Sequence, residues 1–81
     1  PDFEYTTITL NKNVLCKPHY DANNLSPSII VSLGDFTGGQ LNVEGEKYDI
    51  KMRPLKFNGS KLKHWTEPFE GDRYSFIYYK N

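Results

Sequence analysis

The sequence has little of several features that define large classes of proteins. Cys16 is its one cysteine, so no disulfide can form within the chain. No stretch approaches the ~18 consecutive apolar residues of a membrane-spanning helix, and no signal peptide is visible. The 10 basic and 10 acidic residues cancel, which argues against a domain that holds nucleic acid by bulk charge. We therefore expect an intracellular protein of the cytosol or nucleus with no membrane partner.

Helical periodicity of useful length is missing as well, and the chain is short. Its 81 residues suffice for one compact core, which buries roughly 60–65% of the surface of the unfolded chain. Aromatic residues make up 15% of the sequence and supply large packing groups. The chain begins with Pro1 rather than methionine. We therefore expect residues 1–81 to form a single small core that is a fragment of a longer chain.

Short segments rich in β-branched and aromatic residues, separated by turn signals, fill the sequence. The most apolar run, 29–33, is predicted to be the central buried strand, and Leu41 and Val43 to face the core. The glycines of 34–39 predict a tight connection, 43–48 a hairpin and 58–59 a tight turn. Further strands are expected at 3–10, 14–18, 40–44, 47–52, 61–67 and 72–79. Together these predict an all-β fold, a minimal double-stranded β-helix (jelly roll, cupin-like) of about seven to eight short strands.

Two histidines and a carboxylate stand out against this background. His19 and Asp21 are separated by one residue, so both project from the same face of an extended strand. His64 is the one other histidine, and several strands lie between, enough for the chain to wrap and return. Two histidines and one carboxylate form the facial triad of non-haem iron(II), which leaves positions open for a substrate and for oxygen. We predict that His19, Asp21 and His64 are metal ligands and catalytic residues.

Arg73 and Ser75 are also related as i and i+2, on the predicted last strand. A guanidinium binds a carboxylate with two parallel hydrogen bonds, and a neighbouring hydroxyl adds another. The pair is therefore predicted to bind the far carboxylate of an oxo acid.

These residues occur in an order that resembles the Fe(II)/2-oxoglutarate-dependent oxygenase superfamily. The resemblance extends over residues 14–79, through "SPSIIVSLGDFTGGQLNVEG" and "PLKFNGSKLKHWTEPFEGDRYSFIYY". Within the superfamily, the segments "H-x-D…N" and "G-D-x-x-G-G-x-L" are most similar to the TET/JBP-like branch. The resemblance implies Fe(II) on His19, Asp21 and His64, with 2-oxoglutarate on Arg73 and Ser75 and O2 at the open position. It further implies hydroxylation or oxidative demethylation of a C–H bond, with release of succinate and CO2.

The identity of the substrate stays open, and nucleic acid is one candidate. A protein hydroxylase of the prolyl type is an alternative, as is a non-catalytic cupin-like module that binds a metal or a small acid. A core without a substrate lid, with slow and uncoupled turnover, is a further alternative. Several residues have weaker expectations: Asn23 or Asn24 near the cosubstrate, Trp65 and one of Tyr78 and Tyr79 at the pocket, Cys16 as a small buried side chain, and Lys61 and Lys63 as a solvated face that could meet phosphates.

Overall fold

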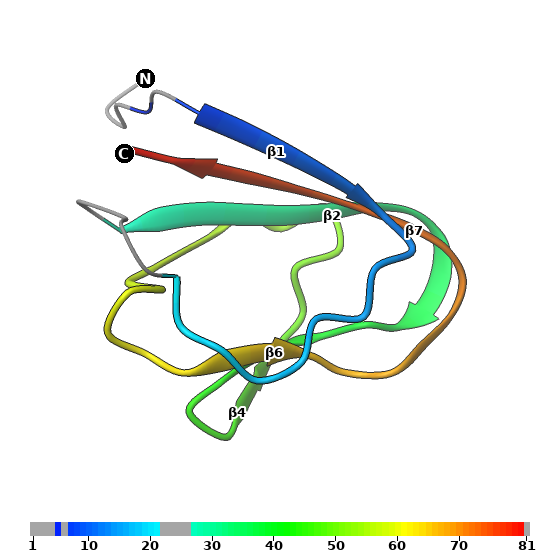
Figure 1. Ribbon diagram of the computed structural model, residues 1–81. Coiled ribbons are helices and arrows are strands. Elements are labelled where there is room, and N and C mark those ends of the chain that lie inside the picture. Colours follow the sequence, from blue (N-terminus) through cyan, green and yellow to red (C-terminus); the bar gives the residue numbers. More distant parts are fainter. Residues whose placement is uncertain (1–4, 6, 22–26, 81) are drawn as a thin grey trace.

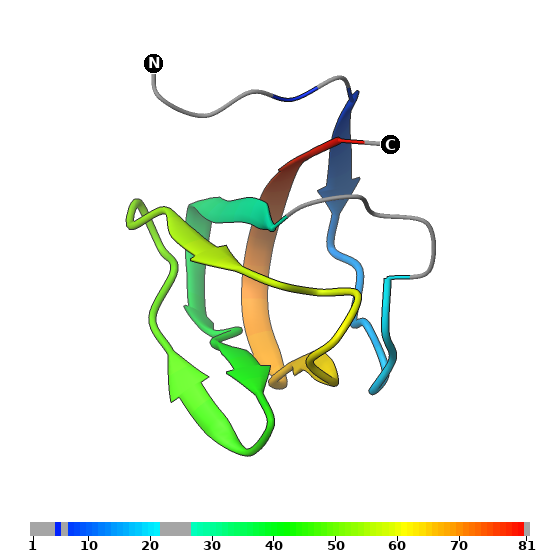
Figure 2. The same ribbon diagram turned by 90° about the vertical axis from the view of Figure 1, so that its left-hand side faces the viewer.

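The computed structural model describes residues 5, 7–21 and 27–80, and over these the chain is entirely β. Its strands form two antiparallel sheets that face one another as two layers (Figures 1 and 2). Their bounds are β1 Thr7–Lys12, β2 Ser28–Gly38, β3 Leu41–Val43, β4 Glu46–Tyr48, β5 Leu55–Phe57, β6 His64–Thr66 and β7 Phe69–Tyr79. The prediction of a small all-β, jelly-roll-like fold is confirmed. Within the described ranges there is no helix long and apolar enough to cross a membrane.

The larger sheet has the order β1-β7-β2-β5 and depends on one long ladder. β2 and β7 are each 11 residues long and pair from Ile29 opposite Tyr78 to Gly38 opposite Phe69. The predicted central strand is confirmed, but the predicted tight connection over 34–39 is wrong, because β2 continues to Gly38. The glycines serve close approach instead: a Cβ built on Gly34 would lie 2.2 Å from the Asp72 carbonyl oxygen.

The first part of the chain also differs from the prediction. β1 runs from Thr7 to Lys12 and so ends later than the strand predicted at 3–10; it is followed by Asn13, whose φ is 55°. Residues 3, 4 and 6 of the predicted first strand lie outside the described residues. The strand predicted at 14–18 is irregular, because pairing with β6 is limited to individual backbone contacts.

The smaller sheet has the order β4-β3-β6. The predicted hairpin is confirmed: β3 and β4 join through Glu44 and Gly45, with φ of 51° and 96°. Positive φ at both turn residues matches the twist of a two-residue hairpin. The strands predicted at 47–52 and 61–67 are shorter than expected, since β4 ends at Tyr48 and β6 begins at His64.

The chain after β4 leaves the smaller sheet for the larger one. Ser32 of β2 donates its N–H to the Ile50 carbonyl and accepts from the Met52 N–H. Ile50 is 1% exposed, whereas Met52 is 74% exposed and has a φ of 56°, so the strand predicted at 47–52 does not extend through this segment. The turn predicted at Asn58 and Gly59 is confirmed, because the Asn58 carbonyl accepts from the N–H of Leu62.

The apolar core fills one part of the space between the sheets. Leu41 and Val43 face it as predicted, and both are buried. The cluster consists of Ile30, Leu41, Val43, Ile50 and Phe57, with Leu55 and Ile77 packed against it. These residues come from both sheets, so the core joins the two layers.

The outer face of the larger sheet is also apolar. The register aligns Ile8 with Tyr78 and Ile29, Leu10 with Phe76 and Val31, and Tyr74 with Leu33. Ile8 and Leu10 are 50% and 57% exposed. The larger sheet therefore has apolar side chains on both faces.

A substitution pair tests the core. Ile50→Ala is expected to lower the free energy of unfolding by about 2–5 kcal/mol, because it removes buried methyl groups and leaves a cavity. Met52→Ala, two residues along the same segment, is the control and is expected to change it by less than about 0.5 kcal/mol. Urea denaturation followed by circular dichroism measures both, and equal effects would contradict this assignment of the core.

Candidate functional site

The segment after β1 is held beside β6 by its backbone. The main chains of His19 and His64 exchange two hydrogen bonds of 3.0 Å, and the N–H of Thr66 reaches the Cys16 carbonyl at 3.0 Å. Figure 1 shows this segment leaving the upper layer to run past β6. Asp21 then donates its N–H to the Gly59 carbonyl at 2.8 Å. These contacts bring together side chains that are far apart in the sequence.

The three predicted metal ligands form one cluster. Nε2 of His19 lies 3.3 Å from Oδ1 of Asp21, and Nε2 of His64 lies 3.3 Å from Oδ2. One potential ligand atom from each residue lies within 4.8 Å of the other two. The His64 side chain is 5% exposed and that of His19 is 41% exposed, so the cluster is closed on one side and open on the other.

Backbone carbonyls orient both rings. Nδ1 of His19 lies 2.6 Å from the Lys17 carbonyl oxygen, and Nδ1 of His64 lies 2.9 Å from that of Leu62. A carbonyl only accepts, so Nδ1 carries hydrogen in each ring and Nε2 faces the carboxylate. With neutral rings, two nitrogen lone pairs would face Asp21, so each contact needs a proton or a cation between the atoms. A histidine that donates its other N–H to a carbonyl is typical of metal ligands.

In the metal-free protein, protons lie between the histidine Nε2 atoms and the Asp21 carboxylate. Burial by itself raises the pKa of Asp21, but the hydrogen bond and the charge of His64, together with His19, outweigh it and lower the pKa below 3.8. Burial by itself lowers the pKa of His64, but hydrogen bonds to Asp21 and to the Leu62 carbonyl, with the Asp21 charge, raise it above 6.5. The metal-free cluster therefore favours an ion pair between Asp21 and protonated His64.

Gly59 leaves the space that the Asp21 carboxylate occupies. A Cβ built on this buried glycine would lie 2.4 Å from Oδ2 of Asp21 and 3.1 Å from Cε1 of His64. Any other side chain here would push the carboxylate away from the rings. The sequence predicts only a turn at Gly59, because no local pattern links this residue to Asp21.

The predicted anion-binding residues lie on the inner face of β7. Arg73 is 2% exposed and Ser75 is 4% exposed. The Arg73 guanidinium carbon lies 5.8 Å from the centre of the Phe36 ring and 5.7 Å from that of Phe69. Gly39 leaves room for it, because a Cβ there would lie 2.8 Å from Nε of Arg73. Burial lowers the pKa of Arg73, and the neighbouring Cys16 acts in the opposite direction.

Three buried polar atoms near this arginine have no hydrogen-bond partner. They are Nε and Nη2 of Arg73 and Oγ of Ser32. No carboxylate of the described residues lies within ion-pair distance of the guanidinium. A buried charge without a partner is costly, so Arg73 fits an anion supplied from outside. Ser32 was missed in the sequence analysis, although a serine inside the most apolar run was a signal.

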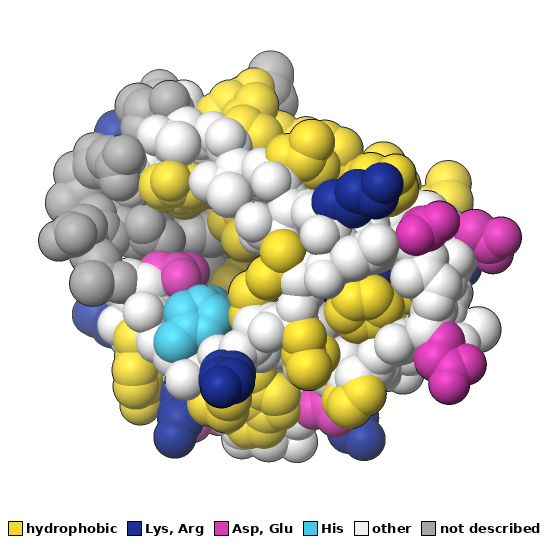
Figure 3. Space-filling model, turned by 45° about the vertical axis from the view of Figure 1, so that its right-hand side comes forward, with side chains coloured by type: hydrophobic (Ala, Val, Ile, Leu, Met, Phe, Trp, Pro, Cys, Tyr) yellow, Lys and Arg dark blue, Asp and Glu magenta, His cyan; other side chains and the backbone are white. Residues whose placement is uncertain are grey.

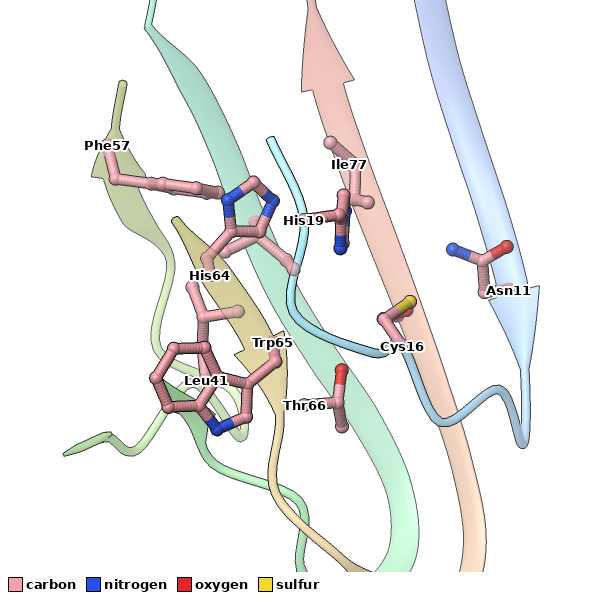
Figure 4. Close-up of a pocket in the computed structure, with 11 residues that line it drawn as sticks. Asn11, Cys16, His19, Leu41, Phe57, His64, Trp65, Thr66 and Ile77 are labelled. Carbon is pink, nitrogen blue, oxygen red and sulfur yellow. The ribbon is translucent and has the colours of Figure 1, made fainter. Parts of the chain in front are cut away.

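A cavity between the two sheets connects the cluster to the inner face of β7. Figure 4 shows side chains from β1, β6, β7 and the segment before His19 around it. In Figure 3, an exposed histidine lies beside a carboxylate, at the edge of a hollow with apolar walls. The cavity is lined by Asn11, Cys16, His19, Ile30, Leu41, Phe57, His64, Trp65, Thr66, Ser75 and Ile77.

The weaker expectations have mixed outcomes. Trp65 lines the cavity and donates its indole N–H to Glu67 at 2.8 Å. Neither Tyr78 nor Tyr79 lines it, contrary to expectation: Tyr78 lies on the outer face, and the Tyr79 hydroxyl accepts from Thr9. Cys16 is half-buried and lines the cavity. Lys61 and Lys63 are exposed, as expected. Asn23 and Asn24 lie outside the described residues.

Substituting Gly59 tests how the cluster is built. Gly59→Ala is expected to weaken binding of Fe(II) or Zn(II) about 10-fold or more, because the new methyl group displaces Asp21. Anaerobic calorimetric titration measures the affinity. Lys61→Ala, at an exposed position of the same turn, is the control and is expected to bind as the wild type does. Wild-type affinity in Gly59→Ala would contradict the assigned geometry.

The pKa shifts predict how the stability of the metal-free protein depends on pH. The lowered pKa of Asp21 stabilises the fold above about pH 3.8, and this contribution is lost as pH falls through the folded-state value. The raised pKa of His64 stabilises it below about pH 6.5, and this contribution is lost as pH rises through the folded-state value. The difference in free energy of unfolding between wild type and Asp21→Asn should therefore be largest between pH 3.8 and 6.5. Denaturation across pH measures it, and a pH-independent difference would contradict the ion pair.

Comparison with known proteins finds similarity to solved structures. No family model matches the chain, and no curated protein is significantly similar to it in sequence. Among solved structures, the fold is similar to that of NgTET1 in complex with 5mC DNA, with a TM-score of 0.84 and 24% identity. The match covers 95% of this chain and 34% of the neighbour, so the chain spans about a third of the neighbour's length. The protein therefore has a TET-like fold.

Proposed function

We propose that this protein is the core of an Fe(II)- and 2-oxoglutarate-dependent dioxygenase that hydroxylates, or oxidatively demethylates, a C–H bond of its substrate. One observation carries the proposal. His19 and His64 of the three-residue cluster line one cavity together with Ser75, and Arg73, two residues before Ser75 on the same face of β7, is buried with unpaired Nε and Nη2. A metal site alone has no need of the arginine.

The residues fit the proposed groups. His19, Asp21 and His64 would hold Fe(II), since their donor atoms converge and both Nε2 atoms face the carboxylate. Arg73 and Ser75 would hold the distal carboxylate of 2-oxoglutarate, because Nε and Nη2 are the pair of donors that grips a carboxylate side-on. When bound, the iron and the oxo acid supply the oxidising power: one atom of O2 enters the new C–OH group and the other enters succinate as CO2 leaves.

The protein itself contributes orientation, electrostatics and exclusion of water. The carbonyls of Lys17 and Leu62 keep Nε2 of each histidine available for a cation. Asp21 provides the negative charge that offsets part of the charge of the ion. Arg73, beside two aromatic rings, fixes the far end of the oxo acid and so sets the position of its reactive end. The exposed side of His19 leaves the cluster open to a substrate.

A methylated base in nucleic acid is the substrate to test first. The structural neighbour was captured with 5mC DNA. Lys61 and Lys63 are exposed and precede His64, and they could contact phosphates. The zero net charge means that such contacts would be local. A prolyl-type protein hydroxylase and a non-catalytic cupin-like binding module are the alternatives.

Anaerobic titration tests the function directly. Fe(II) followed by 2-oxoglutarate is expected to produce a visible metal-to-cosubstrate charge-transfer band in the wild type. His64→Ala and Arg73→Ala should each abolish the band or weaken it greatly, because they remove a metal ligand and the carboxylate receptor. Arg53→Ala, at an exposed arginine, is the matched control and should leave it unchanged.

Two results would contradict the proposal. A folded, metal-loaded wild type without the band would leave a binding module as the better description. A normal band without succinate formation, when O2 and a 5mC oligonucleotide are added, would contradict the nucleic-acid substrate and direct the search to peptides.

A further inference from the structure

Ser32 of β2 combines complete burial with an unpartnered hydroxyl. Its side chain is 0% exposed, and its Oγ has no hydrogen-bond partner. The main chain of the same residue is fully paired: its N–H bonds the Ile50 carbonyl at 2.9 Å, and its carbonyl accepts from the Met52 N–H at 2.8 Å. The hydroxyl is therefore the one part of this residue that the fold does not satisfy. Buried hydroxyls without partners are uncommon in folded proteins and ask for an explanation.

The register of the larger sheet places Ser32 beside the proposed anion-binding pair. Ser32 is directly opposite Ser75, and Arg73 is the diagonal neighbour on the same inner face. Directly opposed residues have Cβ atoms about 4.5–5.5 Å apart, and diagonal neighbours lie within reach of a long side chain. Ser32, Ser75 and Arg73 thus project from one area of the inner face.

The donors in this area match the needs of one carboxylate group. A carboxylate has two oxygens with about four lone-pair positions in total. The Nε and Nη2 donors of Arg73 occupy two of these in a side-on pair, which leaves positions for hydroxyl donors. The three unpartnered buried atoms of the described residues all belong to Arg73 and Ser32.

We propose that Ser32 is a further binding residue of the oxo-acid site, where its hydroxyl donates to the distal carboxylate held by Arg73 and Ser75. The inference rests on the proposed function. It also gives Ser32 a role in selectivity. A dicarboxylic oxo acid accepts a hydrogen bond from the hydroxyl, whereas an oxo acid that ends in a methyl group leaves the hydroxyl unpaired. A binding site discriminates strongly against ligands that leave its buried polar groups unpaired.

The test compares two ligands and two variants. In the Mn(II)-loaded 81-residue chain, we measure the dissociation constants of 2-oxoglutarate and of 2-oxopentanoate, in which a methyl group replaces the distal carboxylate. Ser32→Ala is expected to weaken 2-oxoglutarate roughly 10-fold or more, as for a hydrogen bond to a charged group, and to leave 2-oxopentanoate unchanged. Ser28→Ala is the control, because Ser28 is equally buried on the same face of β2 but lies opposite Phe57 of β5 rather than opposite Ser75.

A thermal melt of the ligand-free protein separates binding from structure. Removing a buried hydroxyl that has no partner is expected to leave the midpoint unchanged or raise it, while the further rise produced by 2-oxoglutarate becomes smaller. A purely structural serine would instead lower the midpoint without ligand. Ser32→Cys has a side chain of similar volume but a weak hydrogen-bond donor. It should change the ligand-free midpoint and the rise produced by 2-oxoglutarate in the same directions as Ser32→Ala does. It replaces Ser32→Ala in the test if that variant does not fold.

The possible outcomes distinguish this inference from the proposed function. If the wild type binds 2-oxoglutarate no better than 2-oxopentanoate, the oxo-acid site itself fails. If the wild type prefers 2-oxoglutarate and Ser32→Ala keeps the whole preference, only the role of Ser32 is overturned. An equal loss of affinity for both ligands in Ser32→Ala also overturns it, because the effect would then not involve the distal carboxylate.

Discussion

The two backbone hydrogen bonds between His19 and His64 are the interaction on which the candidate site depends. They hold the segment after β1 against β6, although that segment has no regular strand of its own. With this pairing, the imidazoles approach to 4.4 Å between ring centres, and the Asp21 carboxylate contacts Nε2 of both rings. Without it, the first two ligands would have no fixed relation to the third.

The interior is unusually polar for so small a protein. Among the described residues, His64, Arg73, Ser32 and Ser75 are buried beside a modest apolar cluster. A small chain has little stability to spare, and unpaired buried groups reduce it further. Such groups are expected where binding of a ligand matters more than stability. The proposed carboxylate site therefore accounts for the unpaired atoms of Arg73 and Ser32.

The similarity to NgTET1 concerns the fold, over about a third of that protein's length. The geometry of this chain adds what fold similarity cannot: ring nitrogens oriented by carbonyls, a carboxylate backed by Gly59, and a carboxylate-sized set of free donors. These features support the proposed function independently of the neighbour. The substrate depends on surfaces outside this cluster.

The sequence by itself determined the all-β class, the hairpin at Glu44 and Gly45, the turn at Asn58 and the membership of the histidine–aspartate cluster. Each of these is encoded locally, in alternating side chains, in turn residues or in the rarity of histidine. Only the tertiary structure decided that β2 continues through its glycines to Gly38, that Ile50 is buried while Met52 is exposed, and that Gly59 lies behind Asp21. It alone placed Ser32 opposite Ser75. These features depend on the register between strands far apart in the chain, and register is set by packing of the whole core rather than by any local pattern.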